Sequence, residues 1–227
     1  MTNWCSNALT LSAKSAQDID RLLTFVHSED SLLDFNNIVP MPPALNDTNP
    51  NTYAELGQAI IEGNTSQWLT RFRTRDITDA VGLCAYYGKT QEEVLAAGQQ
   101  RIETIKLYGV ADWHQWRCKN WGTRGHRRDV RIERNSPTEA CLKFETAWDP
   151  PVPVIVRLAE MFPMVDVGLY FVEMGRGFEG HVTLVNGVMI EEVVGGMSWD
   201  VEDEPTGEEL THEPSSTEGS NDTEVPW

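Results

Sequence analysis

Two groups of side chains in this sequence are of the types that perform acid–base chemistry or bind phosphate. Glu173 ends an apolar stretch directly before a glycine-rich turn, where a carboxyl group could act as a general acid. Arg176 follows three residues later and could simply pair with it. The second group is a basic stretch, residues 117–134, with seven Arg and Lys residues against Asp129 and Glu133. Such a stretch could neutralise phosphates while nearby tryptophans stack on bases.

The candidate binding residues come from these two groups and from the tryptophans beside them. They are Trp121, Arg124, His126, Arg127, Arg128, Arg131, Trp148, Glu173 and Arg176. The basic stretch can equally be a charged edge strand, because charges on an edge discourage aggregation. Phe144 and Phe171 alternate with other residues and are expected to face the core, not an open RNA-binding face. The tryptophans suit the core or a pocket as well as a partner contact.

Other motifs for catalysis, metals or nucleotides are weak. Gly175, Gly177 and Gly180 match the dinucleotide fingerprint, but residues 181–185 read as a strand where that site needs a helix. A glycine-rich hairpin turn or bulge is therefore expected. The possible zinc ligands His114, Cys118, His126 and Cys141 match no standard zinc spacing, so neither a metal nor a cofactor is predicted. No nucleophile elbow or phosphate loop appears, which favours a binding protein over an enzyme.

Composition describes a globular chain with uneven charge. Its 227 residues are 40% hydrophobic and carry a formal net charge of -17. Residues 200–227 hold ten acids and no Lys or Arg, and this acidic tail is expected to be disordered. The four cysteines form no C-x-x-C pair and are expected to be free thiols. No apolar run spans a membrane and no secretory signal is present, so the expected location is the cytoplasm of the cell that makes the protein.

Hydrophobic periodicity and turn residues predict the elements that must position these side chains. The expected order is a strand at 3–11, a helix at 16–28, a strand at 34–40, a helical insertion at about 44–115, strands at 130–133 and 140–146, a helix from 149, a strand at 165–173 and a hairpin at 181–193. Thr90 and Glu93 form a capping box within the insertion, and Asn186-Gly187 indicates a type I′ turn. This order predicts an α+β domain over residues 1–199, with a ferredoxin-like split βαβ core and an extra antiparallel hairpin.

Five sequence blocks resemble the YubB-type ferredoxin-like family of plasmid and phage proteins. They begin at Asn3 (NWCSNALT), Phe35 (FNNIVPMP), Asn120 (NWGT), Thr146 (TAWDPP) and Glu173 (EMGRGFEG). The resemblance implies a ferredoxin-like fold and a mobile-element origin, and therefore a location in the cytoplasm of a bacterial host cell. It implies no iron–sulfur chemistry and transfers no catalytic residue.

The expected function is that of a non-catalytic interaction protein encoded by a phage or plasmid. It would bind a host protein and inhibit a defence or nucleic-acid-processing system, and its acidity would suit a basic partner. The alternative is a single-stranded nucleic-acid binder that uses residues 117–134, and a weaker alternative is an enzyme of unknown reaction. The ten acids of the tail make a rigid DNA mimic less attractive, because they account for much of the net charge.

Overall fold

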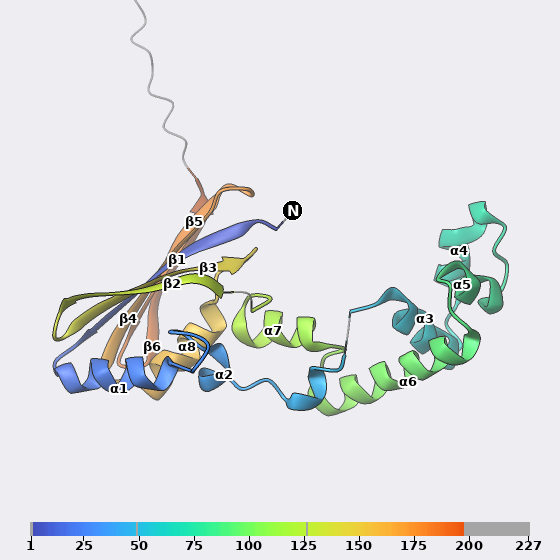
Figure 1. Cartoon of the computed structure of the whole chain (residues 1–227). Coiled ribbons are helices and arrows are strands. Elements are labelled where there is room, and N and C mark those ends of the chain that lie inside the picture. The colour runs from blue at the N-terminus through green and yellow to red at the C-terminus, as the bar shows by residue number, and fades with distance from the viewer. Residues whose placement is uncertain (1, 49, 126, 198–227) are drawn as a thin grey trace, which may run out of the picture. The chain divides into compact units, whose positions relative to one another are not determined.

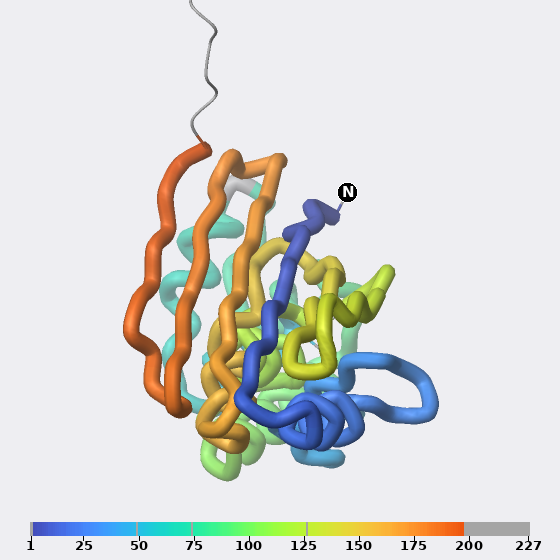
Figure 2. Tube along the Cα trace, turned by 90° about the vertical axis from the view of Figure 1, so that its left-hand side faces the viewer, coloured from blue at the N-terminus to red at the C-terminus, as the bar shows by residue number. Residues whose placement is uncertain are grey.

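A six-stranded antiparallel sheet forms the centre of the computed structural model, which describes residues 2–48, 50–125 and 127–197. Its strands are β1 (Trp4–Ala13), β2 (Arg127–Ser136), β3 (Glu139–Ala147), β4 (Val165–Glu173), β5 (Phe178–Val185) and β6 (Val188–Gly196). They lie in the order β2-β3-β1-β4-β5-β6 (Figures 1 and 2). The predicted tail at 200–227 lies outside the described residues, so its disorder and the boundary at 199 stay predictions.

The first four strands have the ferredoxin-like arrangement. The chain runs β1, α1 (Ala16–Val26), β2, β3, α8 (Val152–Met161) and β4, and β1 lies antiparallel between β3 and β4. Both helices lie on the same side of the sheet, which leaves its other face uncovered (Figure 1). The predicted α+β class and split βαβ core are therefore confirmed, and β5 and β6 extend the sheet beyond β4 as the extra hairpin.

The strand predicted at 34–40 is wrong, because this segment contains the short helix α2 (Phe35–Ile38). The Asp34 carboxylate accepts a hydrogen bond of 3.0 Å from the Asn36 N–H and so caps the helix. Phe35 and Ile38, three residues apart, are both buried. The second strand of the core is instead β2, so the helical segment is inserted between α1 and β2.

Alternation along the strands builds the main core. Cys5, Asn7, Leu9 and Leu11 of β1 are buried, and the alternate residues Ser6, Ala8 and Thr10 face the uncovered side of the sheet. In β4 the same pattern buries Val165, Val167, Leu169, Phe171 and Glu173. Helices α1 and α8 close this core with Ile19, Leu22, Val26, Val154, Ile155, Leu158 and Ala159. Phe144 and Phe171 face this core, as alternation predicted.

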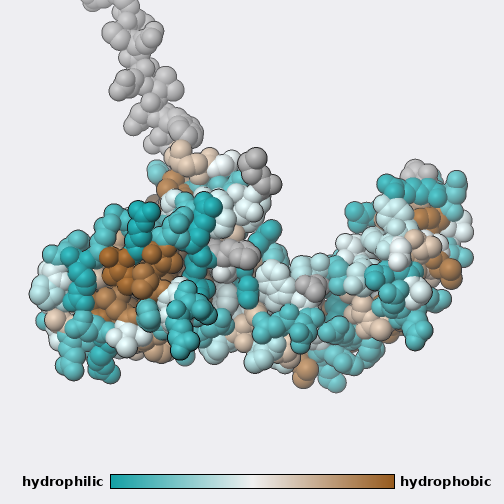
Figure 3. Space-filling model, in the orientation of Figure 1, coloured by the Kyte–Doolittle hydropathy of each residue, from teal (hydrophilic) through white to brown (hydrophobic). Residues whose placement is uncertain are grey.

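The inserted segment has a hydrophobic core of its own. It contains η1 (Pro43–Leu45), α3 (Thr52–Ile61), α4 (Ser66–Phe72), η2 (Arg73–Arg75), α5 (Ala80–Tyr86), α6 (Gln91–Tyr108) and α7 (Trp113–Trp121). Its core residues are Leu56, Phe72, Leu83, Cys84 and Val94. Helices α3 and α6 cross closely at Gly57, where a Cβ atom would lie 2.0 Å from the Val94 carbonyl oxygen. Figure 3 shows hydrophobic side chains exposed around α4 and α5.

Local turn chemistry agrees with the sequence at three places. The capping box between Thr90 and Glu93 is present at the start of α6. Asn186 and Gly187 have φ values of 53° and 76°, as a type I′ turn between β5 and β6 requires. The glycine motif joins β4 to β5, and a Cβ atom on Gly180 would lie 2.3 Å from the Val193 carbonyl oxygen. A strand follows the motif, so it is a hairpin turn and not a dinucleotide site.

Helix α7 was missed by the sequence reasoning, although its caps are ordinary. Asp112 accepts a hydrogen bond of 2.9 Å from the Gln115 N–H, and Gly122 ends the helix with a φ of 81°. The basic stretch is therefore divided between the end of a helix, a connecting loop and strand β2. Within the described ranges, no helix is both long enough and apolar enough to traverse a bilayer.

Candidate functional site

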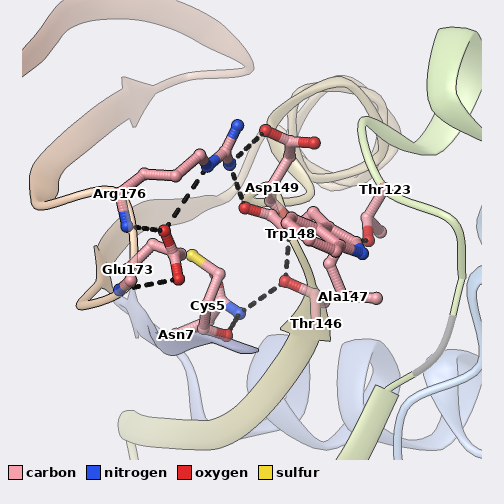
Figure 4. A network of polar contacts seen from close by, with 10 residues as sticks. Cys5, Asn7, Thr123, Thr146, Ala147, Trp148, Asp149, Glu173 and Arg176 are labelled. Carbon is pink, nitrogen blue, oxygen red and sulfur yellow. Dashed lines mark hydrogen bonds and ion pairs between the residues drawn. The ribbon is translucent and has the colours of Figure 1, made fainter. Parts of the chain in front are cut away.

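Three of the sequence blocks meet at one end of the sheet because β1 lies between β3 and β4. Cys5 of β1 is in register with Thr146 of β3 on one side and with Glu173 of β4 on the other. Residues separated by up to about 170 positions in the chain therefore become neighbours. Figure 4 shows the network of polar contacts that results.

Glu173 is the centre of this network and is only 1% exposed. One carboxylate oxygen accepts the Gly175 N–H at 2.9 Å, and the other accepts the Arg176 N–H at 2.6 Å. The Arg176 Nε lies 3.4 Å from that second oxygen. A buried carboxylate needs such donors, because burial without them costs several kcal/mol. Its oxygens are thus already engaged in shaping the β4–β5 turn.

Arg176 carries the network from β4 to the chain after β3. Its Nη2 donates to Asp149 Oδ1 at 2.7 Å and to the Trp148 carbonyl oxygen. The Asp149 side chain pairs with Arg176 and does not cap helix α8, whose N-cap position is Pro151. Trp148 has a φ of 72°, a left-handed conformation that is uncommon for a tryptophan. Arg176 therefore stabilises this strained turn by donating a hydrogen bond to the Trp148 carbonyl oxygen.

A second set of buried polar side chains, on β1 and β3, stabilises the same turn after β3. Asn7 is 4% exposed, and its Nδ2 donates to the Thr146 Oγ1 and to the Cys5 carbonyl oxygen, both at 2.9 Å. The Thr146 hydroxyl donates to the Asp149 carbonyl oxygen at 2.8 Å. Sequence reasoning missed Asn7 and Thr146. The available signal was a polar residue at an inward-facing position of each strand, where the alternation predicts an apolar one.

Cys5 lies inside this network and is fully buried. Burial, followed by the charges of Glu173 and Asp149, raises the pKa of its thiol to about 12. A thiol with this pKa is almost entirely protonated at neutral pH and is a poor nucleophile. The network therefore combines an engaged carboxylate with an inert thiol, which is an arrangement for holding structure.

The two candidate tryptophans have different environments. Trp121 is 1% exposed, donates from Nε1 to the Val39 carbonyl oxygen at 2.8 Å, and packs edge-on against Phe35. This contact joins the FNNIVP block to the NWGT block. Trp148 is half-buried, and the guanidinium carbon of Arg124 lies 5.5 Å from its ring centroid. Of the two, only Trp148 reaches the surface.

Most arginines of the basic stretch are engaged within the protein. Arg127 pairs with Asp34 at 2.9 Å, and its side chain is only 16% exposed. Burial lowers its pKa, and the Asp34 charge opposes this shift. Arg128 pairs with Glu145 of β3 and lies 3.8 Å above the Trp4 ring. These contacts, with that of Arg134 to Asp20, fit the charged edge strand. His126 lies outside the described residues.

The uncovered face of the sheet forms a hollow of about 900 Å³. Residues of β1, β3, β4 and β5 line its floor, and residues of the edge strands β2 and β6 form its two sides. Its ionisable lining residues are Asp129, Glu133, Glu145, Glu179, Arg131, Lys143, Tyr170 and His181. Four acids thus oppose two bases and one histidine. Among the candidate binding residues that the structure describes, only Arg131 lies here, so the structure places those candidates in separate regions.

Tyr170 and His181 give the hollow an aromatic floor. Tyr170 is 53% exposed, and its ring stacks on that of His181 with a centroid distance of 5.7 Å and an angle of 27°. Neither was a candidate from the sequence. The signal for Tyr170 was present, because the alternation that buries Leu169 and Phe171 turns the residue between them to the other face.

One family model of a ferredoxin-like domain agrees with the fold over part of the chain. Residues 127–213 match this family model. Its description is "Ferredoxin-like domain in Api92-like protein", and the match includes β2 to β6, while β1 and α1 lie outside it. A crystal structure of protein api92 from Yersinia pseudotuberculosis is similar with a TM-score of 0.41 and 12% identity, over 86% of this chain and 99% of that one. No curated protein matches the chain.

Proposed function

We propose that this protein is a non-catalytic interaction protein whose open sheet face holds part of another protein. The observation that carries the proposal is the hollow on the uncovered face, with its stacked Tyr170 and His181. An exposed aromatic pair surrounded by charged side chains is typical of protein contacts. The excess of acids in the lining favours a partner segment with basic groups and disfavours a phosphate backbone.

The proposal includes a mobile-element origin and a partner in the bacterial host. The first rests on the resemblance of the sequence blocks to YubB-type plasmid and phage proteins. The second follows from it, since such a protein meets host defence and nucleic-acid-processing proteins, and inhibiting one of them is the proposed outcome. The net charge of -17 supports a basic partner.

The environments of Glu173 and Cys5, the best catalytic candidates, favour a binding role over catalysis. Glu173 is enclosed by donors that stabilise a turn, and the raised pKa of Cys5 keeps its thiol protonated at neutral pH. Within the described residues, no three His, Cys, Asp or Glu side chains gather as a metal site would require.

The test is capture of partners from nuclease-treated host lysate by the full chain and by Tyr170→Ala. Tyr86→Ala is the matched control, because Tyr86 is a tyrosine of similar exposure, 44%, outside the hollow. We expect a stoichiometric protein that the chain and Tyr86→Ala retain and that Tyr170→Ala binds at least about tenfold more weakly. Equal binding by all three proteins would remove the hollow as the binding surface.

Single-stranded nucleic acid remains the alternative, and one observation favours it. Arg124 stacks on the half-buried Trp148, and such exposed pairs can also stack on bases. Arg124→Ala with Arg131→Ala is the appropriate test, since Arg127 and Arg128 hold structural partners and their loss would disturb the fold. Retention of nucleic acid that these changes abolish, with a steep salt dependence, would favour this alternative over the protein-binding role.

A further inference from the structure

The two edges of the sheet are protected to different degrees. Edge strand β2 carries Arg128, Arg131 and Arg134, and its pairing with β3 is interrupted by two register shifts. Charges and bulges of this kind prevent edge-to-edge pairing. Edge strand β6 is nine residues long and contains no Lys, Arg or Pro; its charges are Glu191 and Glu192, and its pairing with β5 has one register shift. Long apolar edges are uncommon in proteins unless something pairs with them.

The side chains of β6 are exposed on both faces of the strand. Every residue from Val188 to Gly196 is exposed, and Val188, Ile190 and Val194 are 62%, 63% and 60% accessible. Scattered exposed apolar residues are normal, but this strand has five of them, Val188, Met189, Ile190, Val193 and Val194, and its outer edge has no strand partner among the described residues. The inner hydrogen-bonding edge of β6 is occupied, since β5 pairs with it from Val188 to Gly196.

The order of residue types along β6 has a regular pattern. The apolar pair Met189-Ile190 is followed by the acidic pair Glu191-Glu192 and then by the apolar pair Val193-Val194. The pairing with β5 skips Ile190, where the register shifts. The register places Met189, Glu192 and Val194 on one face and Val188, Glu191 and Val193 on the other, so each face presents an apolar, an acidic and an apolar residue in turn. A strand that complements β6 on both faces therefore has a basic pair between two apolar pairs.

We propose that β6 binds an extended polypeptide segment of a partner protein by strand addition, and that this segment carries a Lys or Arg pair flanked by apolar pairs. Backbone hydrogen bonds to the free edge would supply affinity, and the cross-strand side-chain pairs would supply selectivity. Val193 and Gly195 also border the hollow, so the added strand extends its side wall. This inference goes beyond the proposed function, because a strand can pair with the edge of β6 without contacting Tyr170 or His181 in the floor of the hollow.

A second copy of this chain is a poorer occupant of the same edge. An antiparallel pair that matches the apolar pairs of two copies sets the two acidic pairs opposite each other. Like charges in directly opposed positions destabilise a strand pair. The acidic pair thus selects against self-association and for a basic segment, which is how specificity is commonly obtained at an open edge.

The experiment measures fluorescence anisotropy of labelled nine-residue peptides with the full chain. One peptide has two central lysines between apolar pairs, and the other has two central glutamates in the same frame. We expect the lysine peptide to bind at least about tenfold more tightly. The double variant Glu191→Lys, Glu192→Lys should reverse this order. Glu29→Lys with Asp30→Lys, which changes the net charge equally at an exposed turn, should leave it unchanged.

Two further measurements separate strand addition from other kinds of binding. A lysine peptide that is N-methylated at its four central residues keeps its side chains but loses the N–H groups, and its binding should fall below detection. If the methylated peptide binds as well as the parent, or if both charge types bind equally, the proposal is overturned. If the double variant does not fold, the salt dependence of peptide binding to the parent chain tests the role of the two glutamates. Binding of the lysine peptide should weaken as the salt concentration rises, and binding of the glutamate peptide should not.

Tyr170→Ala distinguishes this inference from the proposed function. It should reduce capture of the host protein while leaving the peptide affinity within about twofold, because Tyr170 does not lie on β6. A dimer in sedimentation velocity that the lysine peptide dissociates would show that β6 serves a second copy, and would overturn the choice of occupant.

Discussion

Replacing Glu173 by Gln tests whether the polar network at the end of the sheet holds structure. Glutamine keeps the shape of the side chain but replaces one acceptor oxygen by an NH2 group. The Gly175 and Arg176 N–H groups, now at 2.9 and 2.6 Å from separate oxygens, can then no longer both find an acceptor. A charge-assisted hydrogen bond contributes about 1.5–3 kcal/mol, and an unsatisfied buried donor costs about 1–3 kcal/mol.

The expected loss is about 2–4 kcal/mol of the free energy of unfolding, toward the lower end of the combined range. The Arg176 side chain is 43% exposed, so water can hydrate its guanidinium once the carboxylate charge is gone. Urea unfolding at pH 7 and 25 °C, followed by far-UV circular dichroism, measures the difference. Glu179→Gln is the matched control, because Glu179 is exposed on the next strand, and its change should stay below about 0.5 kcal/mol.

Two outcomes would contradict this reasoning. A Glu173→Gln protein within about 0.5 kcal/mol of the parent would mean that the N–H groups do not depend on the carboxylate. A protein more stable than the parent would mean that the carboxylate is held at an energetic cost, as functional groups commonly are. The second result would return Glu173 to the catalytic candidates.

Three other predictions concern thiols and tryptophans. Cys5 ionises near 9.0 when unfolded and near 12 when native, so the parent should lose about 1.4 kcal/mol of stability from this thiol between pH 8 and 10. Cys5→Ala should lack that loss in urea unfolding, and equal losses in both proteins would contradict the assignment. Cys118 has the exposed thiol, so a thiol reagent at pH 8 should rapidly label one site in the parent and no site in Cys118→Ser. Partial burial of the sulfur raises the pKa of Cys118, so this labelling should be slower than that of a free cysteine. More than one rapid site would show that the core opens. Trp121→Phe loses the hydrogen bond to the Val39 carbonyl oxygen and should cost about 2–4 kcal/mol in the same unfolding assay, against less than about 1 kcal/mol for the half-buried Trp113→Phe.

Patterns within single elements were sufficient to predict much of the fold. The alternation of residues 165–173 predicts β4 with its boundaries, and Asn186-Gly187 predicts the turn between β5 and β6. The capping box predicts the start of α6. Each of these signals depends on residues within one strand, turn or helix end, where local sterics and hydrogen bonds determine the conformation.

The segment 34–40 shows where local patterns become ambiguous. A short apolar run before prolines is compatible with a strand or with a single helical turn. The helix is stabilised by the Asp34 cap and by burial of Phe35 against Trp121, a residue 86 positions away. Periodicity over four residues could not include that contact, so the second core strand was expected too early in the chain.

The candidate site was predicted as residue types but not as an arrangement. Glu173 and Arg176 are close in sequence, and their pairing was one of the two interpretations offered for them. The support from Asn7 and Thr146 depends on β1 lying between β3 and β4, which no local pattern contains. To predict the aromatic floor of the hollow, one would also have had to know that both helices cover the same face of the sheet.

The sequence alone determined most of the strands, the main turns and a predominantly apolar core, because these follow from periodicity and from the backbone preferences of neighbouring residues. Only the tertiary structure decided what the charged residues do. Arg127 meets Asp34 and Arg134 meets Asp20 across 93 and 114 residues, so a basic stretch became part of a paired edge. Charge acts through space and is screened or paired by whatever the fold brings near, and for that reason its role cannot be read along the chain.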